Sequence, residues 1–301
     1  LLIENSGFFD RDELQEIYST WREVLDSYPG DRMAVSEAWV PAHRAGRYVS
    51  PTSLHQIFGF DFLVVAWNAE IMQDTITRAI SSVEVVGALP TWALSNHDSP
   101  RVVTRLGGGV KGFARARALA LVAHALPGSI YVYQGEELGL PDAPIADSDR
   151  QDPVFFRTKG SQKGRDGARV PLPWSGKQPP YGFTESTHPT WLPQPSGWAE
   201  LTVSAEQGQP RSTLSLYSRS LKLRTQFTGA AKFIESGDPT VMIFHRDHGI
   251  YCAINTGERE YVLPEFLGTA EVLLDSENVK ASGDKTEVLP PDCARWFHIL
   301  T

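Results

Sequence analysis

Along the first 140 residues, the spacing of apolar positions changes repeatedly between helix and strand periodicity. Helical spacing, with apolar residues three and four apart, covers 11–32, 68–84 and 111–128. The intervening apolar runs, rich in β-branched and aromatic residues, cover 31–40, 54–67, 88–98 and 129–138. Strand and helix in alternation at this spacing predict parallel βα units.

The pattern changes after residue 140. Residues 141–212 are rich in Pro, Gly, Ser and Trp and have few periodic segments, which predicts a long structured loop over the functional face. A helix is expected over 212–227. From residue 229 onward, short alternating runs separated by Gly, Asp, Asn and Pro are typical of an all-β sandwich. We therefore expect an α/β domain over 1–228 and a β-sandwich domain over 229–301.

Composition narrows the function classes. The net charge is −8, and no basic stripe interrupts the sequence, so a nucleic-acid surface is not expected. No apolar run approaches the length of a membrane span, and the first residues lack a basic leader region, so we expect a cytoplasmic protein without a membrane partner. Cys252 and Cys293 leave two alternatives open, one disulfide or two buried thiols.

Polar residues cluster where three predicted strands end. Glu37 follows the first strand, Asn96, His97 and Asp98 follow the third, and the segment 134–137 follows the fourth. In a βα barrel the carboxyl ends of the strands meet at one face, where the chemistry takes place. These positions are therefore the first candidates for a site.

Glu37 and Asp98 together would form a carboxylate pair if both pointed into one opening. Such a pair suits glycosidic cleavage, in which one group holds a proton while the other stays ionised beside a developing positive charge. His97 and Arg101 would add hydrogen-bond donors for sugar hydroxyls. The alternative is structural, with Glu37 capping a turn, Asp98 capping the next helix and His97 satisfied within the fold.

These residues lie in motifs that resemble a known family. "VSEAWVP" and "LSNHDSPRVVTR" resemble the general-acid and Asn-His-Asp motifs of the α-amylase superfamily, glycoside hydrolase family 13. "LHQIFGFDFL", "GSIYVYQGEELGLP", "GRDGARVPLPW" and "THPTWLP" resemble, in the same order, segments of its α-glucosidase and oligo-1,6-glucosidase branch. The resemblance extends from about residue 5 to the C-terminus.

The resemblance implies a role for each candidate. Glu37 corresponds to the general acid/base, and Asp98 to the aspartate that stabilises the transition state. His97 corresponds to a histidine that binds sugar hydroxyls, and Arg101 to an arginine that helps hold the non-reducing glucose. No metal is expected at these residues. Trp39 is expected to form the pocket wall or part of the core.

Two further segments match the family at positions expected to be structural. The segment 165–169 matches a loop near the active-site entrance, where the ion pairs of Asp166 with its flanking arginines are expected to act as a scaffold ahead of substrate contact. The segment 134–137 matches the last barrel strand.

The same resemblance implies that the chain is the second half of a (β/α)8 TIM barrel, strands five to eight, followed by the β sandwich. The nucleophilic aspartate of the family lies in a motif at the fourth strand, so it is expected in a missing N-terminal part. Half a barrel leaves sheet edges unpaired. The N-terminal half of the same enzyme is therefore an expected partner, and a calcium ion, if one binds, is expected there; no other cofactor is required.

The implied function is a retaining α-glucosidase, a glycoside hydrolase that removes terminal α-linked glucose from short maltose-type or isomaltose-type oligosaccharides. A transglycosylase or a sugar isomerase, similar to trehalose synthase or sucrose isomerase, would use the same carboxylates. A non-catalytic glucosidase-like domain is the alternative from another class; Glu37 and the intact Asn96-His97-Asp98 set argue against it.

Overall fold

The computed structural model describes residues 7–277 and 287–299, which divide into two compact units. The first unit contains residues 7–66, 70–93 and 127–131, and the second contains 67–69, 94–126, 132–277 and 287–299. The first six residues, on which the expectation of no leader depends, lie outside the described part, as does residue 300 at the end of the last predicted strand.

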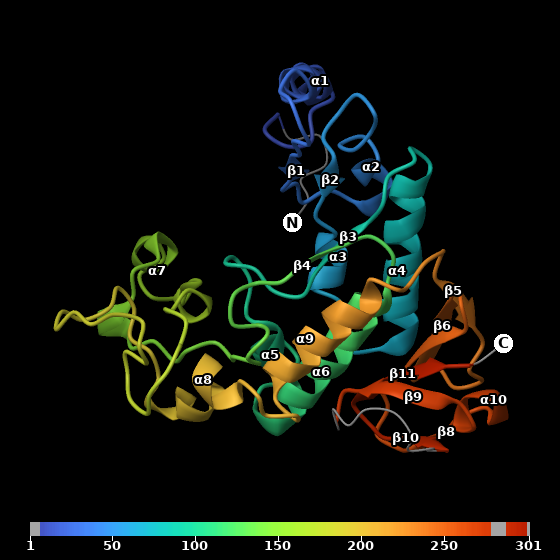
Figure 1. The fold of residues 1–301 in the computed structure, drawn as a ribbon. Coiled ribbons are helices and arrows are strands. Elements are labelled where there is room, and N and C mark those ends of the chain that lie inside the picture. The colour runs from blue at the N-terminus through green and yellow to red at the C-terminus, as the bar shows by residue number, and fades with distance from the viewer. Residues whose placement is uncertain (1–6, 278–286, 300–301) are drawn as a thin grey trace. The chain divides into compact units, whose positions relative to one another are not determined.

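Short parallel strands and their connecting helices make up the first unit (Figure 1). The strands are β1 (Val35–Ser36), β2 (Gln56–Ile57), β3 (Thr91–Ala93) and β4 (Ser129–Tyr131). The helices are α1 (Leu14–Asp26), α2 (Ala42–Ala45), α3 (Phe60–Leu63) and α4 (Ala69–Glu84), of which the first residue of α4 falls in the second unit. Because β1 pairs parallel with β2 and β3 pairs parallel with β4, the predicted βα units are confirmed.

Side chains and backbone join these strand pairs. Gly59, directly after β2, donates its N–H to the carbonyl of Thr91 in β3 at 3.1 Å. A Cβ atom at position 59 would lie only 2.8 Å from that oxygen, so only glycine permits the approach. The amide of Gln56 in β2 bonds to two side chains of β4, Ser129 at 2.6 Å and Tyr131 at 2.8 Å.

The apolar run 54–67 differs from its prediction as one strand region. Only Gln56–Ile57 is extended, and the rest turns into helix α3, which buries Phe62 and Leu63. The ring of Phe62 meets Trp92 of β3 edge-on, at 5.0 Å between ring centroids. A short and mostly apolar run does not distinguish a buried strand from a buried helical turn, and packing against β3 decides between them here.

The second unit contains the remaining helices and the antiparallel sheets. The helices are α5 (Val102–Arg105), α6 (Gly109–Ala125), α7 (Pro153–Arg157), α8 (Val203–Glu206), α9 (Thr213–Arg224) and α10 (Glu265–Gly268). The strands are β5 (Lys232–Ile234), β6 (Val241–Arg246), β7 (Ile250–Asn255), β8 (Tyr261–Val262), β9 (Glu271–Asp275), β10 (Val288–Leu289) and β11 (Cys293–His298). A five-stranded sheet has the order β5-β6-β7-β11-β9, and β10 pairs with β8. The predicted C-terminal β region is therefore present; its boundary at residue 229 stays a prediction.

Helix α6 packs between the antiparallel sheet and α9, as Figure 1 also shows. Trp296 of β11 donates its indole N–H to the carbonyl of Leu121 at 2.9 Å, and Arg246 of β6 donates to the carbonyl of Ala125 at 2.6 Å. On the α9 side, His124 bonds to Ser220 at 2.8 Å. Residues 116–125 of α6 are buried throughout, which explains why this part of the helix is rich in Ala and Leu.

The segment 141–212 is ordered around a core of its own, as predicted for a structured loop. Tyr181 is fully buried there and donates to the carbonyl oxygens of Pro195 and Ser196 at 2.9 and 2.7 Å. Trp198 packs in the same cluster with Leu192. That the segment 141–212 lies over the active-site face stays a prediction.

Both cysteines are buried free thiols in the second unit, so the thiol alternative is the one observed. Burial raises the pKa of both Cys252 and Cys293, the latter to about 12. Among residues 7–277 and 287–299, none of the helices is both long and apolar enough to cross a membrane.

Candidate active site

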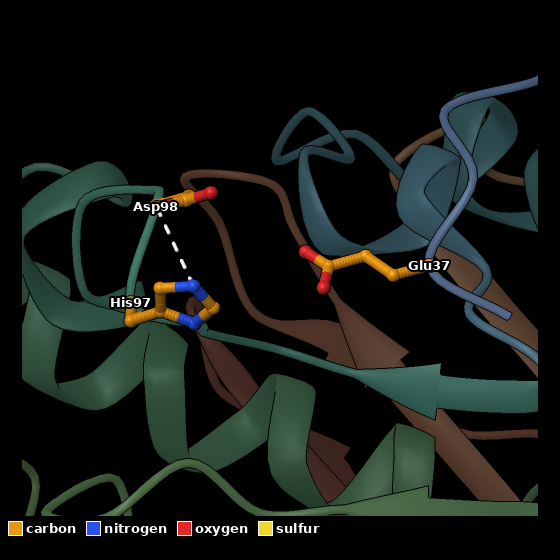
Figure 2. Close-up of side chains that lie close together, drawn as sticks. All are labelled: Glu37, His97 and Asp98. Atoms are coloured by element: carbon orange, nitrogen blue, oxygen red, sulfur yellow. Dashed lines mark ion pairs between the residues drawn. The ribbon is translucent and has the colours of Figure 1, made fainter. Parts of the chain in front are cut away.

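Glu37 lies in the first unit, directly after β1. Its side chain is exposed, and Figure 2 shows it extending away from the backbone. Two residues further on, the ring of Trp39 stacks on Phe60 with 4.1 Å between centroids and 6° between planes, while 43% of Trp39 stays exposed. Trp39 is therefore both packed on one face and open on the other.

The polar triplet after β3 is held by its own side chains. Asn96 accepts the backbone N–H of Asp98 on its side-chain oxygen at 3.0 Å, which closes a local turn. Ser95 accepts the N–H of Val102 at 2.9 Å and so fixes the start of α5. The turn brings the carboxylate of Asp98 to a partly exposed position beside His97, whose Nε2 lies 3.5 Å from Oδ1 of Asp98 (Figure 2).

Two arginines from the segment 165–169 converge on Asp98. Arg165 donates from Nη1 to Oδ1 of Asp98 at 2.8 Å, and Arg169 donates from Nη2 to the same oxygen at 2.6 Å. Arg169 also donates from Nε to the backbone carbonyl of His97 at 2.7 Å. Partial burial by itself raises the pKa of Asp98, but the charges of His97 and Arg165, with the hydrogen bonds from both arginines, bring that pKa below its ordinary value. The carboxylate is thus kept ionised.

The sequence did not identify Arg165 and Arg169 as partners of Asp98. It expected them to form ion pairs with Asp166, and that expectation is wrong within the described residues: Asp166 is fully buried, and its Oδ2 accepts the backbone N–H groups of Gln151 and Asp152 instead. The arginines lie 67 and 71 residues from Asp98 along the chain, too far for any local spacing to indicate the contact.

The guanidinium of Arg101 is buried and bonded to backbone carbonyls, whereas a donor for sugar hydroxyls would be open to solvent. It is only 1% exposed, and it donates from Nη1 to the carbonyl of Gln134 at 2.7 Å and from Nη2 to the carbonyl of Ala168 at 3.0 Å. Burial lowers the pKa of its guanidinium. Within the described residues Arg101 joins the segment after β4 to the segment 165–169, and its predicted contact with glucose stays a prediction.

The segment 134–137 contains a buried carboxyl. Glu136 is 3% exposed and accepts a hydrogen bond from the hydroxyl of Tyr217 at 2.9 Å. Loss of hydration on burial raises the pKa of Glu136 to about 8. The segment is a turn that follows β4 and not part of the last strand, while its buried carboxyl fits the structural role that the sequence indicated.

Glu37 belongs to the first compact unit, and Asp98 belongs to the second. The predicted pairing of their carboxylates across one sugar-sized opening stays a prediction, as do the roles of Glu37, His97 and Asp98. The expected absence of a metal and of a required cofactor, with calcium only in a preceding part, also stays a prediction.

The comparison with known families fits the motifs at these positions. A family model described as the catalytic domain of alpha amylase matches residues 4–231. The chain belongs to the α-amylase family. This member of the α-amylase family therefore carries Glu37 and Asp98 within the matched catalytic region.

Curated relatives include a probable alpha-glucosidase of Rhizobium meliloti (strain 1021), 31% identical over 265 residues that cover 83% of this chain and 46% of the relative. An oligo-1,6-glucosidase of Parageobacillus thermoglucosidasius is 28% identical over 323 residues, covering 92% of this chain and 56% of the relative. The chain thus spans about half the length of these α-amylase family relatives.

Solved structures agree on the fold. The alpha-glucosyl transfer enzyme XgtA matches with a TM-score of 0.80 and 30% identity, covering 95% of this chain and 54% of that protein. The trehalose-6-phosphate hydrolase of Bacillus licheniformis matches with a TM-score of 0.78 and 24% identity, covering 97% and 60%. These matches confirm the predicted fold class, the second half of a (β/α)8 barrel followed by a C-terminal β domain.

Proposed function

We propose that this chain supplies the general acid/base, Glu37, and the transition-state-stabilising carboxylate, Asp98, of a retaining α-glucosidase. The substrate class is short oligosaccharides with terminal α-linked glucose. The observation that carries the proposal is the Asp98 carboxylate, which follows a barrel strand and is held ionised by Arg165 and Arg169. An ionised carboxylate in a fixed position stabilises the positive charge that develops on the sugar ring in the transition state.

In the proposed mechanism, an aspartate in a preceding part of the polypeptide attacks the anomeric carbon while protonated Glu37 donates its proton to the leaving oxygen. A glucosyl–enzyme ester forms, and the glycosidic bond breaks. Glu37 then removes a proton from water, which attacks the anomeric carbon and releases glucose and the free aspartate. Asp98 stays ionised throughout, and His97 hydrogen-bonds to sugar hydroxyls. The preceding part also pairs with the open edges of the barrel strands.

The same residues serve a transglycosylase or a sugar isomerase, in which a second sugar takes the place of water. The similarity to XgtA, an alpha-glucosyl transfer enzyme, supports keeping this candidate. Chromatography of the products from maltose and from sucrose separates the candidates: free glucose indicates hydrolysis, and longer or isomeric glucosides indicate transfer.

The test uses the intact polypeptide that carries this chain, with its mass measured first. A mass close to twice that of these 301 residues would fit the presence of a preceding half. Glu37→Gln and Asp98→Asn should each lower kcat on maltose or isomaltose by about 10²- to 10⁴-fold. Glu84→Gln, an exposed residue at the end of α4, is the matched control and should leave kcat unchanged. Full activity in E37Q would refute the role of Glu37 as general acid/base, and absence of activity in the unaltered polypeptide would favour a non-catalytic domain.

A further inference from the structure

Asp152 is a buried carboxylate whose hydrogen bonds converge on one arginine. Its side chain is fully buried, and Oδ2 accepts from Arg165 twice, from the backbone N–H at 2.9 Å and from Nε at 2.7 Å. Oδ1 accepts from Nη2 of Arg165 at 3.3 Å and from the N–H of Val154 at 3.0 Å. The Nε–Nη2 edge of the guanidinium is therefore held against Asp152.

The backbone around Asp152 is built for this contact. Gly164 precedes Arg165 with φ +73°, and a Cβ atom there would lie 2.7 Å from the Cβ atom and 2.9 Å from Cγ of Asp152. Only glycine both adopts this positive φ without strain and leaves room for the Asp152 side chain. From the other side, the buried carboxylate of Asp166 accepts the N–H of Asp152 at 3.1 Å, which fixes the backbone that carries Asp152.

The second amino group of Arg165 is directed at Asp98. With one edge on Asp152, Arg165 donates from Nη1 to Oδ1 of Asp98 at 2.8 Å. Because a guanidinium is planar and rigid, fixing its Nε–Nη2 edge also fixes the direction of Nη1. Arg169 donates to the same carboxylate of Asp98, but its second hydrogen bond goes to the carbonyl of His97 and not to Asp152.

We infer that Asp152 is a positioning residue that acts through Arg165 to hold the Asp98 carboxylate in place for reaction. The side chain of Arg165 is 38% exposed, so solvent competes for its guanidinium once this anchor is lost. The inference rests on the proposed function of Asp98. The strength of the anchor is consistent with the hydrogen bond from Arg165, which holds the pKa of Asp152 far below its ordinary value.

The alternative is that Asp152 acts only as a negative charge beside Arg165. When Asp152 is replaced by a neutral residue, the two roles predict opposite shifts in the pKa of Asp98. Loss of the charge alone would strengthen the field of Arg165 at Asp98 and lower the pKa of Asp98. Loss of positioning would let the guanidinium move away and raise that pKa. Among the described residues of the second unit, the charged or titratable groups that pair with Asp98 are His97, Arg165 and Arg169.

The test is a carbon-13 NMR titration of the Asp98 carboxyl in the intact protein. Asp152→Asn should raise the pKa of Asp98 in the same direction as Arg165→Gln, and D152N should add nothing in an R165Q background. Asp147→Asn removes the same charge from the same loop, where Asp147 pairs with Arg150 and Lys163, and should leave the titration unchanged. Gly164→Ala keeps every charge, displaces the Asp152 carboxylate, and should also raise the pKa of Asp98. If D152N does not fold, G164A shows whether the pKa of Asp98 rises or falls when the positioning is lost.

Kinetics give the second readout. If Asp98 stabilises the transition state, D152N should lower kcat by about 10- to 100-fold with a smaller change in KM. An unchanged or lowered pKa of Asp98 in folded D152N or G164A would overturn the positioning role. A protein without glucosidase activity would refute the proposed function instead, and the titration would still decide the role of Asp152.

Discussion

Arg169 holds Asp98 at two points, with Nη2 2.6 Å from the carboxylate Oδ1 and Nε 2.7 Å from the carbonyl of the preceding residue, His97. One guanidinium thus binds both the side chain of Asp98 and the backbone that carries it. A planar fork of donors can do this, and a point charge cannot.

Replacement of Arg169 should therefore separate charge from geometry. We expect kcat on an α-glucoside to fall in the order wild type, Arg169→Lys, Arg169→Gln, with R169Q lower by about 10²-fold. R169K keeps the charge but loses one of the two bonds, so it should recover only part of the activity. The pKa of Asp98, measured by NMR, should rise in R169Q. Wild-type kcat in R169K would show that charge alone matters.

Glu136 should make stability depend on pH. Burial raises its pKa to about 8 in the folded protein, whereas its ordinary value is 4.5. Between these limits the folded state holds a proton that the unfolded state has lost, so the free energy of unfolding should fall as pH rises through this window, by up to roughly 1.4 kcal/mol per pH unit. Denaturant unfolding from pH 5 to pH 8 measures the slope.

The matched variant for this prediction is Glu136→Gln, which still accepts from Tyr217 and cannot ionise. Its free energy of unfolding should vary less with pH than that of the wild type, and the difference between them should grow toward pH 8. Parallel curves for the two proteins would show that Glu136 does not titrate in this range.

The two thiols should resist modification in the folded protein. Burial raises the pKa of Cys252 and Cys293, so neither forms the reactive thiolate near neutral pH. At pH 7.5 an aromatic disulfide reagent should therefore react with neither thiol in the native protein. After unfolding in denaturant it should react with both. An unfolded, unreduced protein in which neither thiol reacts would indicate a disulfide.

Trp296 should couple the antiparallel sheet to α6. It is fully buried, donates to Leu121 and packs edge-on against Phe227 at 4.8 Å. Trp296→Ala should lower the free energy of unfolding by about 3–5 kcal/mol through the cavity and the lost hydrogen bond. Val262→Ala, at a position 71% exposed, should change it by less than about 0.5 kcal/mol. Similar values for the two variants would contradict the coupling.

The sequence-based prediction was strongest where the pattern was local. The helix expected over 212–227 is α9, and the alternating runs after residue 229 form antiparallel strands. It was weakest in the mostly apolar run 54–67, where a strand gives way to α3 at Gly59, because packing against β3 sets the backbone there.

The sequence by itself determined the order of the motifs, the βα units with their polar strand ends, and thus the position of Glu37 and of Asp98 along the chain. Those features depend on neighbouring residues only. The tertiary structure decided which cations meet Asp98: Arg165 and Arg169 reach it from a distant loop, while Arg101, three residues away in sequence, turns inward to backbone carbonyls. Long side chains bind wherever folding brings an unsatisfied partner within reach, and sequence spacing carries no information on that distance.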